Sequence, residues 1–296
     1  MPIIEGGTGV ALERIVLATD FSPSAEAASV YAEALARRFG SKLTVANVVD
    51  LSVASRSAAV VGPAIEQMRH YSAENLGRTI NQLRETGLKV DGKAMEAERP
   101  SAAVVRLAGD QDADLLVLGT HGRTGLQKII LGSFAQGAIH HCKCPVLTIG
   151  PNVPRLHTEG LSFETILFAT DLHHQTAEKA AIALAFAQDS RGRILLCHVI
   201  DRPPSDLTAA LERQFETEGT LRRLIPNAFY DWCTPEPEVE FGSPAEQILQ
   251  LATRAQADLI VLGAKRSTTW LTQFVEGVAG HVIANATCPV MTVCAD

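Results

Sequence analysis

Hydrophobic residues in this chain gather in short runs that end at polar or turn residues. The runs are rich in Ile, Leu and Val and lack the alternation of a half-exposed strand, which is typical of strands buried on both faces of a sheet. They are 14–19 (RIVLAT), 43–49 (LTVANVV), 114–119 (DLLVLG), 165–170 (TILFAT) and 194–200 (ILLCHVI). Each of these runs therefore predicts a buried strand.

Amphipathic stretches follow these runs. Ala28, Ala32, Leu35 and Phe39 recur at spacings of four, three and four, which predicts a helix with one apolar face. Suitable residues begin the helices: Ser22-Pro23 before this one, and 243–246 (SPAE), a capping box that opens a helix to about residue 255. Helices are also expected in 133–142 and within 206–224, the latter inside a Pro-interrupted insertion at 202–237 to which no chemistry is assigned.

Strands that alternate with helices predict an α/β fold, in which a parallel sheet is covered by helices on both faces. Ligands of such folds bind beyond the carboxyl ends of the strands, where the strand order reverses. We therefore expect Asp20, Val48 and Gly119 to meet at one edge of the sheet.

The pattern occurs twice. ADLLVLGTHG at 113–122 recurs 144 residues later as ADLIVLGAKR, and CPVLTI at 144–149 recurs at the same offset as CPVMTV. IVLATDFS at 15–22 is answered 151 residues later by ILFATDLH. Residues 150–164, with two Pro and two Gly, have no apolar period and are interpreted as a linker. The repeat predicts two doubly wound domains, 1–150 and 151–296.

Composition excludes several functional classes. The chain of 296 residues has a net charge of −7 and no run of Lys or Arg, so it lacks the positive surface that nucleic acid binding requires. No apolar stretch approaches the ~20 residues of a membrane span, and the first residues do not resemble a signal peptide. We expect a cytoplasmic protein that binds neither nucleic acid nor membrane.

Six cysteines are interpreted as buried thiols. A metal site in 140–144 (HHCKC) is the alternative, but its spacing matches no paired C-x2-C site, and no metal ligands are assigned.

The glycine-rich stretch 119–133 (GTHGRTGLQKIILGS) lies between a predicted strand and a predicted helix. The first N–H groups of a helix are unpaired and the helix dipole is positive there, so this arrangement favours phosphate. The Walker motif is absent, and the only run like a dinucleotide fingerprint, 6–11 (GGTGVA), precedes the first strand. A flexible connection between strand and helix is the alternative that composition alone leaves open.

The spacing Gly119-x2-Gly122-x9-Gly132-Ser133, with ATDFS at 18–22 and CPVLTI at 144–149, resembles the nucleotide-binding signature of the universal stress protein family. The resemblance covers both halves and implies five parallel strands in each, in the order 3-2-1-4-5, with ATP at the carboxyl edge and Mg²⁺ held only through its phosphates. It also implies that the last strands, ending at Ile149 and Val293, pair the halves into a pseudo-dimer; a further homodimer stays open. The nucleotide-binding residues it implies are Ala18, Thr19, Asp20, Val48, Leu118, Gly119, His121, Gly122, Arg123, Gly132, Ser133 and Phe134.

Some of these residues have simpler interpretations. Asp20 is suited to accept from a ribose hydroxyl or an adenine amine, and the alternative is that it caps a turn. Arg123 is expected to reach phosphate oxygens, whereas Lys128 is expected to be a solvated surface charge. His121 has no positioned partner in the sequence, so no catalytic residue is assigned.

The second half departs from the signature. At the offset of 144, Gly122 is replaced by Arg266, Gly132 by Glu276 and Ser133 by Gly277. A carboxylate opposes a polyphosphate, so we expect the second half to bind ATP poorly, although Asp171 still matches Asp20.

Three functions follow from these observations. The first is an ATP-binding regulatory protein of the stress response, with the nucleotide as a conformational or partner switch. The second is a slow ATPase or an adenylate-handling enzyme, and the third is a structural pseudo-dimer scaffold. The intact glycine loop of the first half favours the regulatory protein over the scaffold. The enzyme is disfavoured because no carboxylate pair in the sequence stands beside that loop to hold a metal.

Overall fold

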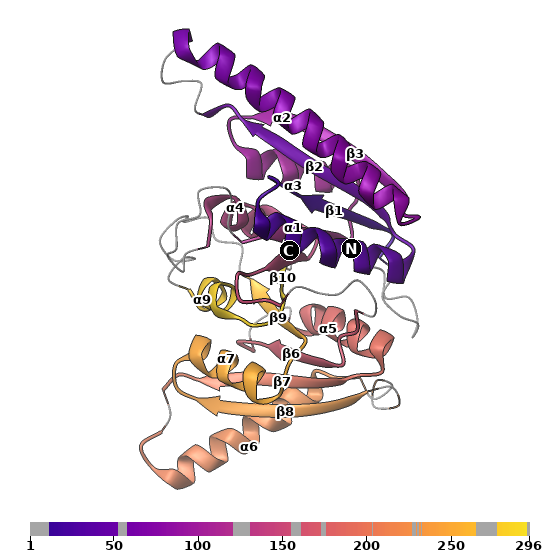
Figure 1. The fold of residues 1–296 in the computed structure, drawn as a ribbon. Coiled ribbons are helices and arrows are strands. Elements are labelled where there is room, and N and C mark those ends of the chain that lie inside the picture. The colour runs from indigo at the N-terminus through magenta and orange to yellow at the C-terminus, as the bar shows by residue number, and fades with distance from the viewer. Residues whose placement is uncertain are drawn as a thin grey trace. The chain divides into compact units, whose positions relative to one another are not determined.

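The computed structural model describes residues 12–52, 58–120, 131–154, 161–172, 176–202, 204–226, 229, 231, 233–264 and 277–294. They form two compact units, of which one contains Leu12–Pro151 and the other Ser162–Asp296. The first unit contains β1 (Arg14–Ala18), α1 (Pro23–Phe39), β2 (Lys42–Asp50), α2 (Ala58–Glu85), β3 (Val90–Ala97), α3 (Pro100–Asp110), β4 (Leu115–Gly119), α4 (Ser133–His141) and β5 (Val146–Ile149). Figure 1 follows these elements along the chain.

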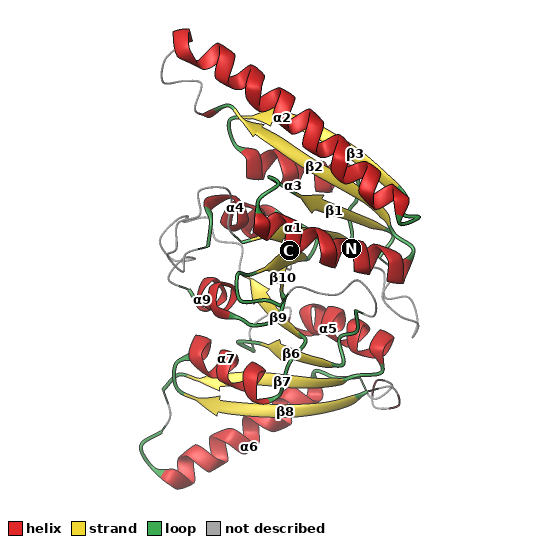
Figure 2. Ribbon diagram, viewed as in Figure 1, coloured by secondary structure: helices red, strands yellow, loops and turns green. Residues whose placement is uncertain are grey.

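The second unit repeats this order. It contains β6 (Thr165–Ala169), α5 (Thr176–Ser190), β7 (Arg193–Ile200), α6 (Leu207–Arg223), β8 (Thr234–Phe241), α7 (Pro244–Arg254), β9 (Leu259–Ala264), α9 (Val278–Asn285) and β10 (Val290–Cys294). Figure 2 shows the alternation of strands and helices within each unit. None of the described helices is long and apolar enough to cross a membrane.

Each unit has one five-stranded sheet. The strand order is β3-β2-β1-β4-β5 in the first unit and β8-β7-β6-β9-β10 in the second, and neighbouring strands within each unit are parallel. The order reverses beside β1 and β6, so successive crossovers place α1 and α2 on one face of the first sheet and α3 and α4 on the other. The predicted α/β fold with the order 3-2-1-4-5 is confirmed.

The central strands are buried on both faces, as their continuous apolar runs predict. Ile15, Val16 and Leu17 of β1 are each at most 1% exposed, and the equivalent residues of β6 are likewise buried. α1 begins as predicted: the Ser22 side chain accepts a hydrogen bond from Ala25 N, and Pro23 is its first residue. A buried β1 and a fixed start of α1 together set the position of the turn between them.

Backbone geometry also repeats. Three turns in each half contain one residue in the left-handed region of φ, at the offset that relates the sequences. The pairs are Phe21 (63°) with Leu172 (58°), Gly40 (67°) with Arg191 (52°), and Asp112 (47°) with Gln256 (52°). Only Gly40 is a glycine, and a left-handed φ costs other residues free energy that surrounding packing must offset. The turns are therefore fixed by the fold and not by local preference.

Two sequence predictions are corrected in the second half. The helix predicted after Ser243 is observed as α7, but the Ser243 side chain makes no capping hydrogen bond. The helix predicted within 206–224 is observed as α6, but the interpretation of 202–237 as an insertion is wrong, because the first half of β8 lies in it and β8 pairs with β7 as the third strand of the sheet. Pro235 and Pro237 hide this strand in the sequence; proline lacks an N–H, and β8 tolerates it because it pairs on one side only.

Candidate functional site

The carboxyl ends of β1, β2 and β4 bring the predicted first-half residues to one edge. Ala18 is level with Ala46 of β2 and with Leu118 of β4. Asp20 and Val48 each follow two residues later, Asp20 just beyond the end of β1 and Val48 still within β2, and Gly119 ends β4. Leu118 is buried, whereas Asp20, Val48 and Gly119 are partly exposed. The expected convergence of these three residues is found.

The turn after β1 is held by its own side chains. Thr19 N donates to Ala46 O (2.9 Å), Thr19 Oγ1 accepts from Phe21 N (3.0 Å), and Asp20 Oδ1 accepts from Ser22 N (3.0 Å). Asp20 thus caps the turn, which is the simpler of the two roles that the sequence allowed. Capping leaves lone pairs on a carboxylate for a ligand, so the two roles are compatible.

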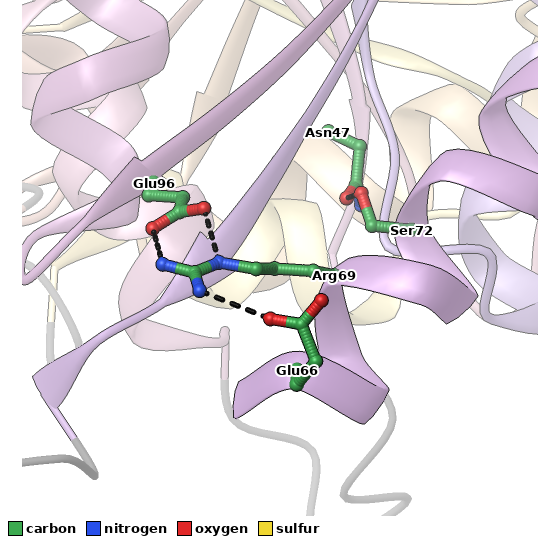
Figure 3. A network of polar contacts seen from close by, with 5 residues as sticks. All are labelled: Asn47, Glu66, Arg69, Ser72 and Glu96. Carbon is green, nitrogen blue, oxygen red and sulfur yellow. Dashed lines mark hydrogen bonds and ion pairs between the residues drawn. The ribbon is translucent and has the colours of Figure 1, made fainter. Parts of the chain in front are cut away.

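The β1 turn is also tied to α2. Asn47 Nδ2 donates to Thr19 O (2.7 Å), and Asn47 Oδ1 accepts from Ser72 Oγ on α2 (Figure 3). Nearer the start of α2, Arg69 forms a bidentate pair with Glu96 of β3 (2.7 and 2.8 Å) and lowers the pKa of that carboxyl through its hydrogen bonds. A change at the β1 turn is therefore connected to α2 through Asn47 and Ser72.

Gly119 has a packing role that the sequence analysis missed. A Cβ at this position would lie 2.7 Å from both the backbone C and O of Ser24, so only glycine allows the first turn of α1 to approach the end of β4. The interpretation of Gly119 as bare backbone for a phosphate is unnecessary, because close packing already requires it. The sequence did indicate this packing role in one way, because Gly119 lies at the end of a predicted strand, where a helix packs against the sheet.

The amino end of α4 faces the same edge. Gly132 precedes the helix with φ −63° and ψ 149°, and its N–H donates to Thr120 O (3.0 Å), the residue after β4. Ser133 is the first helical residue and is exposed, and Phe134 is partly buried. The start of α4 is thereby linked to the end of β4, which is the arrangement that a phosphate site at a helix terminus needs.

Part of the predicted site cannot be placed. His121, Gly122, Arg123 and Lys128 lie outside the described residues. Their roles stay predictions.

The second half contains a cavity of about 750 Å³ at the equivalent edge. Seven of its lining residues are the repeat counterparts of Ala18, Thr19, Asp20, Val48, Leu118, Gly119 and Phe134. They are Ala169, Thr170, Asp171, Val199, Leu262, Gly263 and Val278. The positions that the signature assigns to a nucleotide in the first half thus surround one cavity in the second.

Five cysteines whose side chains the structure describes are buried. Cys142, Cys144, Cys197, Cys233 and Cys288 are free thiols with at most 7% exposure. A hydrogen bond with Cys142 (3.3 Å) and burial raise the pKa of Cys144, and burial raises the pKa of Cys197 and of Cys288 to about 12. The thiols of Cys144, Cys197 and Cys288 therefore stay protonated at neutral pH. No group of three or more His, Cys, Asp or Glu among the residues described could hold a metal ion.

Comparison with known proteins agrees with the fold and the repeat. The model of the universal stress protein family matches residues 11–150 and 162–293. A universal stress protein of Methanocaldococcus jannaschii is 32% identical over 152 residues, which are 50% of this chain and 86% of that protein. A universal stress protein of Archaeoglobus fulgidus has a similar structure over 95% of this chain and 96% of its own, with a TM-score of 0.71 and 20% identity.

A further match, a universal stress protein solved in complex with cAMP, covers 47% of this chain and 97% of its own, with a TM-score of 0.38 and 25% identity. Because the family model matches nearly the whole chain in two copies, the chain belongs to the universal stress protein family, with two such domains in tandem.

Proposed function

We propose that the first half binds ATP at the carboxyl edge of its sheet and acts as a nucleotide-dependent switch in a stress response. The observation that carries the proposal is the convergence of Asp20, Val48 and the start of α4 at one edge. We also propose that the functional halves are residues 1–150 and 151–296.

Each part of the edge suits one part of the ligand. Asp20 offers a carboxylate to hydroxyl or amine donors, and Val48 offers an apolar surface to a base. Gly132 and Ser133 lie at a helix amino end, where unpaired N–H groups attract phosphate. Mg²⁺ would be held through the phosphates, which it prefers together with water.

The proposed switch has a mechanical connection. Contacts with a nucleotide at Asp20 act on a turn whose carbonyl is bonded to Asn47, and Asn47 is bonded to Ser72 on α2. A ligand biases two conformations only by its difference in affinity for them, so a rearranged Asn47–Ser72 contact is the element that would report occupancy.

We expect ATP to stabilise the chain without ordinary turnover. At ~100 times its dissociation constant a ligand adds about 2.7 kcal/mol to the free energy of unfolding, so the melting temperature should rise with ATP concentration. Phosphate release should stay far below the ~1 to 10³ s⁻¹ of ordinary enzymes. Both are measured on one purified sample, by thermal unfolding and by a phosphate assay. Turnover in the ordinary range that is lost in Asp20→Ala would favour the ATPase instead.

We expect one ATP per chain. The second half carries Arg266 and Glu276 where the first has Gly122 and Gly132. Equilibrium dialysis, or extraction of nucleotide from denatured protein, gives the ratio directly. A ratio of two would show that the second half tolerates these replacements. A ratio of zero, with no thermal shift, would contradict nucleotide binding and favour the scaffold.

A further inference from the structure

The cavity of the second half differs in chemistry from the predicted nucleotide site of the first. It has a volume of about 750 Å³, within the range of small-molecule sites, and all of its lining residues belong to the second half. They come from the ends of β6, β7 and β9, from the helices α5, α6, α7 and α9, and from the segment after β7. A ligand here would contact several elements of one unit.

Three cationic side chains surround this cavity: Lys179 on α5, Arg202 after β7 and Arg213 on α6. Within the part of the chain that the structure describes, none of the three forms an ion pair. Lys179 is partly buried, and its side chain lies over the end of β9, because a Cβ on Gly263 would be 2.9 Å from Lys179 Cδ and 3.2 Å from Nζ. A partly buried ammonium at a cavity wall without a carboxylate partner favours an anionic ligand.

Two of these cations, Lys179 and Arg202, are specific to the second half. At the offset of 151, Lys179 corresponds to Ala28, which is fully buried, and Arg202 corresponds to Leu51. The same half lacks the Gly132-Ser133 pair of the first. Positive charge is therefore gained at α5 and after β7, in the half where Arg266 and Glu276 replace Gly122 and Gly132.

His198 adds a polar group to the same wall. It corresponds to Asn47, and its Nδ1 lies 2.8 Å from Thr170 O, just as Asn47 Nδ2 bonds Thr19 O. When Nδ1 carries the proton for that bond, Nε2 is an acceptor. Both halves therefore keep a hydrogen bond to the turn after their first strand, β1 or β6. The side chain that makes this bond is an amide in the first half and an imidazole in the second.

The remaining lining limits the ligand. Among the described lining residues, Asp171 and Asp201 oppose the three cations, which leaves one unit of positive charge, and both carboxylates can accept from ligand hydroxyl or amine groups. Apolar side chains, among them Val199, Ile248 and Leu262, form the rest of the wall. A polyphosphate carries too much negative charge for this balance, whereas an apolar body with one oxyanion fits it.

We propose that the second half binds an organic molecule with an apolar body and a single oxyanion group, either a carboxylate or a phosphate monoester, through Lys179, Arg202 and Arg213. This proposal is independent of nucleotide binding by the first half. According to this proposal, the second half has not lost ligand binding but binds a different ligand from the first.

The test uses the full chain and three small probes of similar size: benzoate, phenyl phosphate and the neutral benzyl alcohol. Calorimetric titration is performed on the natural chain and on Lys179→Met, which keeps most of the apolar length of the side chain but removes its charge. Arg213→Gln is paired with Arg222→Gln, a control on the same helix that does not line the cavity. Lys179→Arg restores the charge, and thermal unfolding of every variant shows that it folds.

We expect one of the two anions to bind saturably and benzyl alcohol to bind at least about tenfold more weakly. Lys179→Met and Arg213→Gln should each weaken the anion about tenfold, as loss of one charge-assisted contact does, while Lys179→Arg and Arg222→Gln should not. The tighter anion identifies the carboxylate or the phosphate as the group that is recognised.

Equal binding of benzyl alcohol, binding unaffected by either cation variant, or no binding of either anion would overturn the proposal. ATP that binds more tightly than both anions and loses affinity in Lys179→Met would overturn it as well, because the cavity would then be a nucleotide site. Failure of ATP binding in the first half would leave these outcomes unchanged, so the two proposals are separable.

Discussion

Gly132→Glu should abolish ATP binding by the first half while leaving the fold intact. The substitution copies the Glu276 of the second half and places a carboxylate at the start of α4. At ~4 Å and an effective dielectric constant of ~20, repulsion between two unit charges is about 4 kcal/mol, or about a thousandfold in affinity. Gly132 has φ −63°, which any residue adopts, so backbone strain does not accompany the change. Calorimetric titration with ATP measures the loss.

Gly132→Ala is the matched control for this experiment. Its Cβ would lie 3.1 Å from Thr120 O, which needs only a small shift, and it adds no charge. We expect this variant to keep affinity within about tenfold of the natural chain. Comparable losses in both variants would indicate a steric effect, and unchanged affinity in Gly132→Glu would remove the phosphate from this helix start altogether. In either case the unfolding temperature without ligand shows whether the fold is preserved.

The local signals in the sequence identified the central elements correctly. Ser22 and Pro23 begin α1 because a capping hydroxyl and a fixed φ act within one turn, and the run at 14–19 becomes β1 because it is buried on both faces. Edge strands escaped the same reasoning. Within the described residues β3 at Val90–Ala97 pairs only with β2, and all of its residues except Val90 are partly or fully exposed, so its sequence has no continuous apolar run.

The sequence predicted those site residues whose positions are set by the ends of strands. It did not predict the roles of residues that depend on packing between distant segments. Register alone brings Asp20 and Val48 to one edge, which the alternation of strands and helices predicts. The reason for Gly119 is the backbone of Ser24, a contact between segments far apart in sequence. Lys179 reaches its cavity from α5, and only comparison with Ala28 in the other half could have revealed it as a gained charge.

Gly119→Ala should destabilise the chain much more than Gly263→Ala, although the repeat makes the two positions equivalent. At Gly119 the added Cβ would lie 2.7 Å from the backbone C and O of Ser24, so α1 must move away from β4. Overpacking of this kind costs roughly 1–3 kcal/mol. At Gly263 the nearest atom among the described residues is Cδ of Lys179 at 2.9 Å, and a flexible side chain moves at little cost. Alanine there also reduces the entropy of the unfolded chain, which offsets part of the cost.

Thermal and denaturant unfolding of the two variants measure this difference. A loss of 2 kcal/mol lowers the melting temperature by roughly 4–8 °C in a domain of this size, whereas Gly263→Ala should change it by no more than about 2 °C. Equal shifts would mean that α1 and α5 approach their strands equally closely, contrary to the contacts at Ser24 and Lys179. The expected asymmetry follows from one difference between the halves: the glycine of the first makes room for helix backbone, and the glycine of the second makes room for a cation.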